Sequence, residues 1–109
     1  MADISIVGVN KQGCVENTQF QGRQNLSQYS FDLSDQPNPQ WSQDFNQAIS
    51  LSSVLTNMNA HITVSGKVLS IYVPKGSNPQ PAVDEVKKAI GEANHSTSDF
   101  QQRVNNIKV

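Results

Sequence analysis

Residues 60–73 decide the fold; they read AHITVSGKVLSIYV. Two runs rich in β-branched residues meet at Ser65-Gly66-Lys67, where a two-residue turn at Ser65-Gly66 or at Gly66-Lys67 can join them. Either turn places the apolar residues of both runs on one face of the ladder and the polar residues on the other. The stretch therefore predicts a β-hairpin, and its apolar face is formed by Ile62, Val64, Leu69, Ile71 and Val73.

Two further strands are expected before this hairpin. Residues 26–33 alternate between apolar and polar side chains, which is typical of a strand with one buried face. Residues 3–9 are rich in β-branched residues, with apolar side chains on both faces. The polar stretch 10–25 between them predicts a long polar loop, a disordered excursion, or a loop that contains a weak strand near Cys14–Phe20.

A first helix is predicted over residues 39–57. Asn38 supplies an N-cap oxygen, and Pro39 suits the first helical position because its missing N–H has no role there. Trp41 and Phe45 begin an apolar stripe at helical spacing, so we interpret Trp41 as a core residue rather than a binding anchor.

A second helix is predicted to begin near Pro81. Its apolar stripe pauses at residues 94–97 and resumes at Phe100, Val104 and Ile107. The resumed spacing of i, i+4, i+7 predicts a last short helix or a kinked continuation of the same helix.

The order of elements is β-β-α-β-β-α with a helical tail. Strands with one apolar face and helices with one apolar stripe pack most economically in two layers. We therefore expect a single α+β domain over residues 1–109. It is a two-layer sandwich with a largely antiparallel sheet of about four strands and two main helices on one face.

Composition limits the classes of function. Of 109 residues, 36% are hydrophobic and 16% are charged, while Gln, Asn and Ser contribute 12, 11 and 13 residues. A net charge of -1 does not fit a protein that neutralises nucleic-acid phosphates. No apolar run approaches the roughly 18 residues of a membrane span, and residues 1–5 do not resemble a signal peptide. Together with a single cysteine, these features predict a cytoplasmic protein without membrane or nucleic-acid partners.

Residues that could carry catalysis are few. Cys14 is the only thiol, and no spacing places His61 or His95 beside it as a base. No cluster of His, Cys and carboxylates has the spacing of metal ligands, and no glycine-rich phosphate loop is present. We therefore expect no catalytic residue, no metal and no cofactor, and consider an enzyme the less favoured class.

One group of polar residues on the predicted sheet is a candidate binding surface. The solvent face of the predicted sheet gathers hydroxyls, amides, an imidazole and one aromatic ring, which suits protein contact or a small polar ligand. A plain solvated sheet face is the simpler alternative. The candidate binding residues on this face are Gln28, Ser30, Asp32, His61, Thr63, Ser70 and Tyr72.

The sequence thus favours a small non-catalytic module that binds another protein or itself. The alternative is a small-ligand-binding protein or a small enzyme that uses His61 and Tyr72, or Cys14. Self-association has two predicted routes: edge-to-edge pairing through residues 4–9, or packing through the sheet face that carries His61 and Tyr72.

Overall fold

The predicted hairpin is present at one edge of the sheet. In the computed structural model, which describes residues 3–108, β4 (His61–Ser65) pairs antiparallel with β5 (Val68–Pro74). Gly66 opens the two-residue turn with a φ of +59°, a conformation that glycine adopts without steric cost. The five apolar residues lie on one face: Leu69, Ile71 and Val73 are buried, and Ile62 and Val64 are half-buried on the edge strand.

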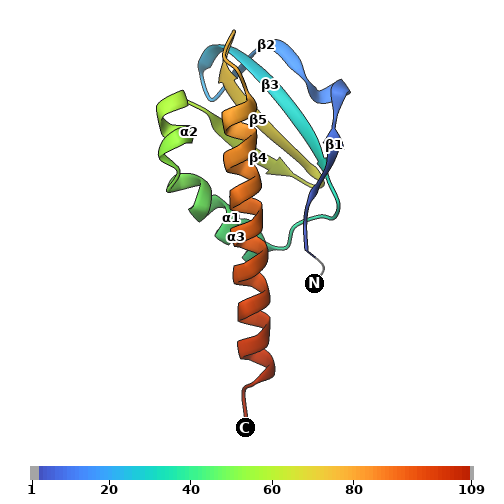
Figure 1. Ribbon diagram of the computed structural model, residues 1–109. Helices are drawn as coiled ribbons and strands as arrows, with labels where there is room; N and C mark the ends of the chain where they lie inside the picture. Colours follow the sequence, from blue (N-terminus) through green and yellow to red (C-terminus); the bar gives the residue numbers. More distant parts are fainter. Residues whose placement is uncertain (1–2, 109) are drawn as a thin grey trace.

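The sheet is organised around β3 (Arg23–Leu33). One edge of β3 pairs with β5, and its other edge pairs with β1 (Ile6–Val9) and β2 (Val15–Phe20) along successive parts of its length. Each of these pairings is antiparallel, and the order is β1-β3-β5-β4 with β2 beside β3 (Figure 1). The α+β two-layer prediction is confirmed, with five strands where about four were expected.

The additional strand comes from the polar stretch 10–25. This stretch contains a 3-10 helix, η1 (Lys11–Gly13), followed by β2. A turn at Gln21-Gly22 then connects β2 to β3. Both turn residues have positive φ, 51° and 80°, as a tight two-residue hairpin turn requires. Of the alternatives for this stretch, the structure has the one with a strand between Cys14 and Phe20.

The first helical segment is divided in two. α1 (Pro39–Ser50) begins where predicted, and the side chain of Asn38 accepts a hydrogen bond from the N–H of Trp41 at 2.8 Å. The expected single helix to residue 57 is wrong, because Ser52 acts as an N-cap and starts a separate helix, α2 (Ser53–Met58). Asn59 ends α2 in the left-handed conformation, with a φ of 57°.

The last helix is continuous. α3 (Gln80–Asn105) has 26 residues, or about 39 Å of helix, and neither a break nor a separate tail helix occurs at residues 94–97. The pause in the apolar pattern has a structural reason. Asn94 faces inward and hydrogen-bonds to Ile4 and Trp41, and Thr97 is buried.

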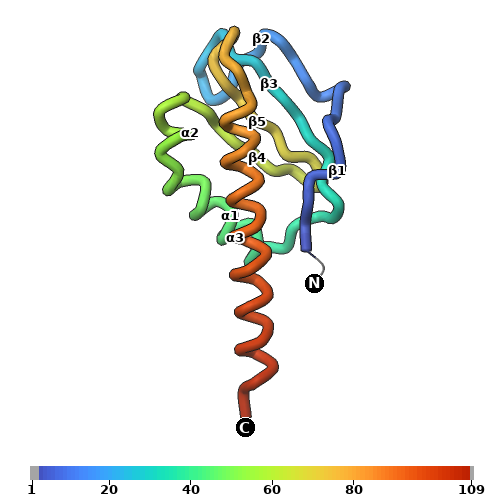
Figure 2. The backbone as a smooth tube through the Cα atoms, viewed as in Figure 1, coloured from blue at the N-terminus to red at the C-terminus, as the bar shows by residue number. Residues whose placement is uncertain are grey.

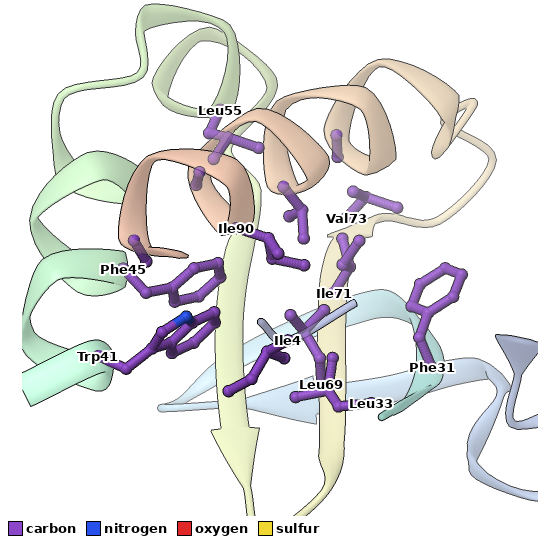
Figure 3. Packing of buried hydrophobic residues seen from close by; sticks show 14 residues of the cluster. Ile4, Phe31, Leu33, Trp41, Phe45, Leu55, Leu69, Ile71, Val73 and Ile90 are labelled. Atoms are coloured by element: carbon purple, nitrogen blue, oxygen red, sulfur yellow. The ribbon is translucent and has the colours of Figure 1, made fainter. Parts of the chain in front are cut away.

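The core lies between the sheet and the helices. Trp41 stacks on Phe45 with ring centroids 5.1 Å apart, and Ile4 reaches the same cluster from the N-terminal segment (Figure 3). Trp41 is 1% exposed, which confirms it as a core residue. Helices α1, α2 and α3 cover the face of the sheet that carries Leu69 and Ile71, and the opposite face carries the predicted polar residues.

Candidate functional site

The sheet register gathers the predicted polar residues on one face. Gln28 and His61 lie on either side of Tyr72, and Ser30 and Thr63 lie on either side of Ser70. Asp32 follows at the end of the same face, opposite Val68. The alternation within residues 26–33 and within the two runs of the hairpin was sufficient to predict this set.

The middle of this face is covered by the chain itself. Ser30 is 1% exposed and Ser70 is 8% exposed, with 2.9 Å between their hydroxyl oxygens. The Ser30 hydroxyl also donates to the carbonyl of Gly13 at 2.9 Å, so η1 lies over Ser30. This part of the face is an internal hydrogen-bond network, and a partner meets only its margins.

The close approach of Gly13 to Ser30 has a measurable consequence. A Cβ on Gly13 would lie 2.8 Å from Cβ and Oγ of Ser30, which is too buried to move away. We expect Gly13→Ala to lower the free energy of unfolding by about 1–3 kcal/mol, measured by urea denaturation. Gly8→Ala is the matched control, because a Cβ there meets nothing within 4 Å. Equal losses in the two variants would contradict the packing of η1 on β3.

At one margin the β2–β3 hairpin folds over the ends of β4 and β5. The ring of Phe20 stacks on that of Tyr72 with centroids 4.4 Å apart and lies 5.8 Å from that of His61. Arg23 Nη1 contacts His61 Nε2. Because a guanidinium only donates, Nε2 accepts this bond and the imidazole is neutral. Burial, and then the positive charge of Arg23, lower the pKa of His61 below 6.5.

The lowered pKa of His61 predicts a pH dependence of stability. A histidine with a lower pKa in the folded state binds protons more readily when unfolded, so its stabilising contribution is complete above pH 6.5 and is lost as the pH falls below it. We expect His61→Gln to reduce the loss of stability between about pH 7.5 and about pH 5.5, measured by urea denaturation at both values. The control is His95→Gln on the exposed surface of α3. An unaltered pH dependence in His61→Gln would contradict the assigned neutral imidazole.

The arrangement around His61 offers little for catalysis. A hollow of about 360 Å³ lies beside it, and its lining includes Phe20, Leu55 and Thr63 but neither Tyr72 nor a carboxylate. Cys14 contacts backbone atoms of Asn10 and Ser30 rather than a histidine. Within residues 3–108, no three His, Cys, Asp or Glu side chains are grouped so that they could hold a metal ion.

An exposed apolar surface lies at the end of α3. The helix extends beyond the sheet and the other helices (Figures 1 and 2), and Phe100, Val104 and Ile107 are 44%, 43% and 67% exposed. Phe100 and Val104 continue the stripe with which the first half of α3 covers the core, and Ile107 lies two residues beyond the helix end at Asn105. We name these three residues the α3 stripe. Their spacing was visible in the sequence, which predicted a helix there without predicting that the helix projects.

A second apolar surface lies at the other end of the molecule. Between β1 and the beginning of α3 the core face of the sheet is left partly open, with a groove of about 370 Å³. Its lining is mainly apolar. We name this hollow the β1–α3 groove; its lining includes Ile6, Val9, Tyr29, Phe31, Pro79 and Val83.

Comparison of the chain with protein-family models, with curated proteins and with solved structures returns no match. Between residues 3 and 108, no helix is both long enough and apolar enough to cross a membrane. Function is therefore argued from the surfaces described above.

Proposed function

We propose that the protein is a non-catalytic interaction module and that the projecting half of α3 is the element that binds. The observation that carries this proposal is the α3 stripe: Phe100 and Val104 are exposed although they continue the buried stripe of the same helix, and Ile107 is exposed just beyond the helix end. Covering a Phe, Val or Ile side chain is worth about 1.5–3 kcal/mol, so a binding partner would gain substantially from this face.

The remaining features of the chain support a protein partner. A net charge of -1 gives no attraction for nucleic acid, and an amphipathic helix is a common recognition element for protein grooves. The single thiol, Cys14, is compatible with a reducing compartment, and we place the protein in the cytoplasm.

The alternative function, ligand binding at His61 and Tyr72, has less support. It would require both rings to face an open hollow, whereas Phe20 stacks on Tyr72 and Arg23 contacts His61. The hollow beside His61 is lined without Tyr72.

The proposal is tested by the native mass of the protein isolated from its own cell lysate. We expect a defined complex in the wild type, and we expect Phe100→Asp to weaken it at least about tenfold because a charge replaces a buried apolar contact. Gln102→Asp is the matched control, since it adds the same charge on the opposite side of the helix. A complex indifferent to Phe100→Asp, or a bare monomer in the lysate, would contradict the proposal.

A further inference from the structure

We propose that the free edge of β4 is a second binding site, and that it accepts an extended, uncharged segment of a partner polypeptide as an added strand. β4 is the last strand in the order β1-β3-β5-β4, so within residues 3–108 one of its edges has no neighbouring strand (Figure 1). Backbone N–H and C=O groups on such an edge form a template for a further strand. The hollow beside this edge includes no residue of α3, so the site is separate from the α3 stripe.

Hydrogen bonds at the two ends of β5 establish the direction of its backbone groups. Leu33 N donates to Lys67 O at 2.8 Å, just before β5 begins. Just after β5 ends, Lys75 N donates to Asn25 O at 2.9 Å. Backbone groups alternate in direction along a strand, and the pairing of β5 with β3 contains no shift. The odd-numbered residues of β5 therefore face β3, and the even-numbered residues face β4.

Two residues of β4 direct their backbone groups to the free edge. The even-numbered residues of β5 that face β4 are paired with His61, Thr63 and Ser65. Ile62 and Val64 consequently point their N–H and C=O groups away from β5, and these groups have no backbone partner elsewhere between residues 3 and 108. Two donors and two acceptors that alternate along an edge are complementary in partial charge to another extended chain. A helix offers no such match, because its backbone groups bond to one another.

The opposite edge of the sheet is less suited to a partner strand. It is formed by β1 and β2, and the register of both strands on β3 is interrupted, for example between Ile6 and Gly8. Interruptions of this kind bend and twist an edge, which hinders further pairing. The pairing of β4 with β5 is unbroken along its length, and β4 contains no proline, lysine or carboxylate that would oppose an added strand.

The free edge of β4 lines a hollow of about 360 Å³ that has a wall on each face of the sheet. On the helix side the wall includes Ile49 of α1 and Leu55 of α2, and on the polar side it includes Phe20 and Gln21 from the end of β2. A single strand fits between these walls. A second copy paired through the same edge would bring its own walls into the same space, so the hollow favours one extended chain.

The walls also determine which side chains such a segment carries. A residue paired with Ile62 has its side chain on the same face of the sheet as Ile62, next to the half-buried Ile49, so an apolar side chain fits there. The neighbouring residues of the segment face Thr63 and Phe20 on the polar side, where a hydroxyl fits. Among the described residues, no Asp, Glu, Lys or Arg lines the hollow, so a charge in the bound segment would lose water without gaining a partner.

Hydrogen exchange of single amides, followed by NMR, tests the proposal with a synthetic probe. The probe is a capped peptide of about seven residues in which Thr and Val alternate, and its control carries an N-methyl group on each Val. In the dilute free chain we expect the amides of Ile62 and Val64 to exchange at least about tenfold faster than that of Thr63. Peptide at about 1 mM should slow Ile62 and Val64 at least about tenfold, whereas the N-methylated peptide, which lacks the donors, should not.

A pair of variants at one position of β4 separates the backbone group from the side chain. Val64→Pro removes an N–H that points away from β5, so the pairing with β5 is kept, and we expect the peptide to bind at least about fivefold more weakly. Val64→Ala is the matched control, because it keeps the N–H, and its affinity should stay within about twofold of the wild type. Circular dichroism checks the fold of both. If Val64→Pro does not fold, the two peptides on the wild-type chain make the same comparison.

The proposal is overturned by any of four results. Protected Ile62 and Val64 amides in the dilute free chain would mean that the chain itself covers the edge. Protection that grows with protein concentration alone would mean that a second copy occupies it. Equal effects of the two peptides would mean binding without backbone pairing, and no added protection by the peptide would mean that the edge accepts no strand. Phe100→Asp should leave peptide binding unchanged, so each of these results leaves the proposed function of the α3 stripe intact.

Discussion

Trp41→Ala is expected to lower the free energy of unfolding by about 3–5 kcal/mol. The indole is 1% exposed and stacks on Phe45, so truncation removes a large apolar side chain and leaves a cavity between α1 and α3. The indole N–H also donates to Asn94 Oδ1 at 2.8 Å, and that bond is lost as well. Chemical denaturation of the purified protein measures the loss.

A conservative variant separates packing from the hydrogen bond. Trp41→Phe keeps a ring that can stack on Phe45 but removes the N–H donor, so its loss should be clearly smaller than that of Trp41→Ala. An unchanged denaturation midpoint in Trp41→Ala would contradict the core position of Trp41 and return it to the role of a binding anchor.

Asn94→Ala is the second large effect that we expect. The side chain of Asn94 accepts from Ile4 N at 3.0 Å and from Trp41 Nε1 at 2.8 Å, and it donates to Ile4 O at 2.8 Å. Truncation leaves three partly buried polar groups without this partner, at about 1–3 kcal/mol for each group that water cannot reach. We expect a total loss of about 3 kcal/mol or more in the free energy of unfolding.

The matched control for Asn94→Ala lies on the same helix. Asn105→Ala makes the same chemical change at an exposed position near the end of α3, where the change in stability should be within about 0.5 kcal/mol. Hydrogen exchange of the Ile4 amide gives a local measure, because its protection should fall in Asn94→Ala alone. Similar losses in the two variants would show that Asn94 does not fasten the N-terminal segment to α1 and α3.

The alternation of apolar and polar residues was enough to predict which side chains share a face of the sheet. The two-residue period of a strand can be read from a short stretch of sequence. The runs 61–65 and 68–74 fixed the hairpin, and Tyr29, Phe31 and Leu33 gave the face of β3. The division between α1 and α2 was missed because Ser52 lies among polar residues that also fit the exposed side of a single helix. Its action as an N-cap depends on the backbone geometry at that residue.

The surfaces were harder to predict because they depend on tertiary packing. Nothing in residues 10–25 indicates that Gly13 covers Ser30, or that the hairpin turn brings Phe20 onto Tyr72. Asn94 was visible only as an interruption of an apolar stripe, although it lies 90 residues from its partner Ile4. The spacing of Phe100, Val104 and Ile107 was evident, but only the length of α3 relative to the sheet shows that they project.

The native mass of the protein isolated from its own cell lysate tests the central claim most directly, namely that the projecting half of α3 binds a protein partner. We expect the wild-type chain to be found in a defined complex well above the 12.0 kDa of one chain, and Phe100→Asp to be found mainly at the mass of one chain. A wild-type chain that stays at 12.0 kDa in the lysate would contradict binding through the α3 stripe.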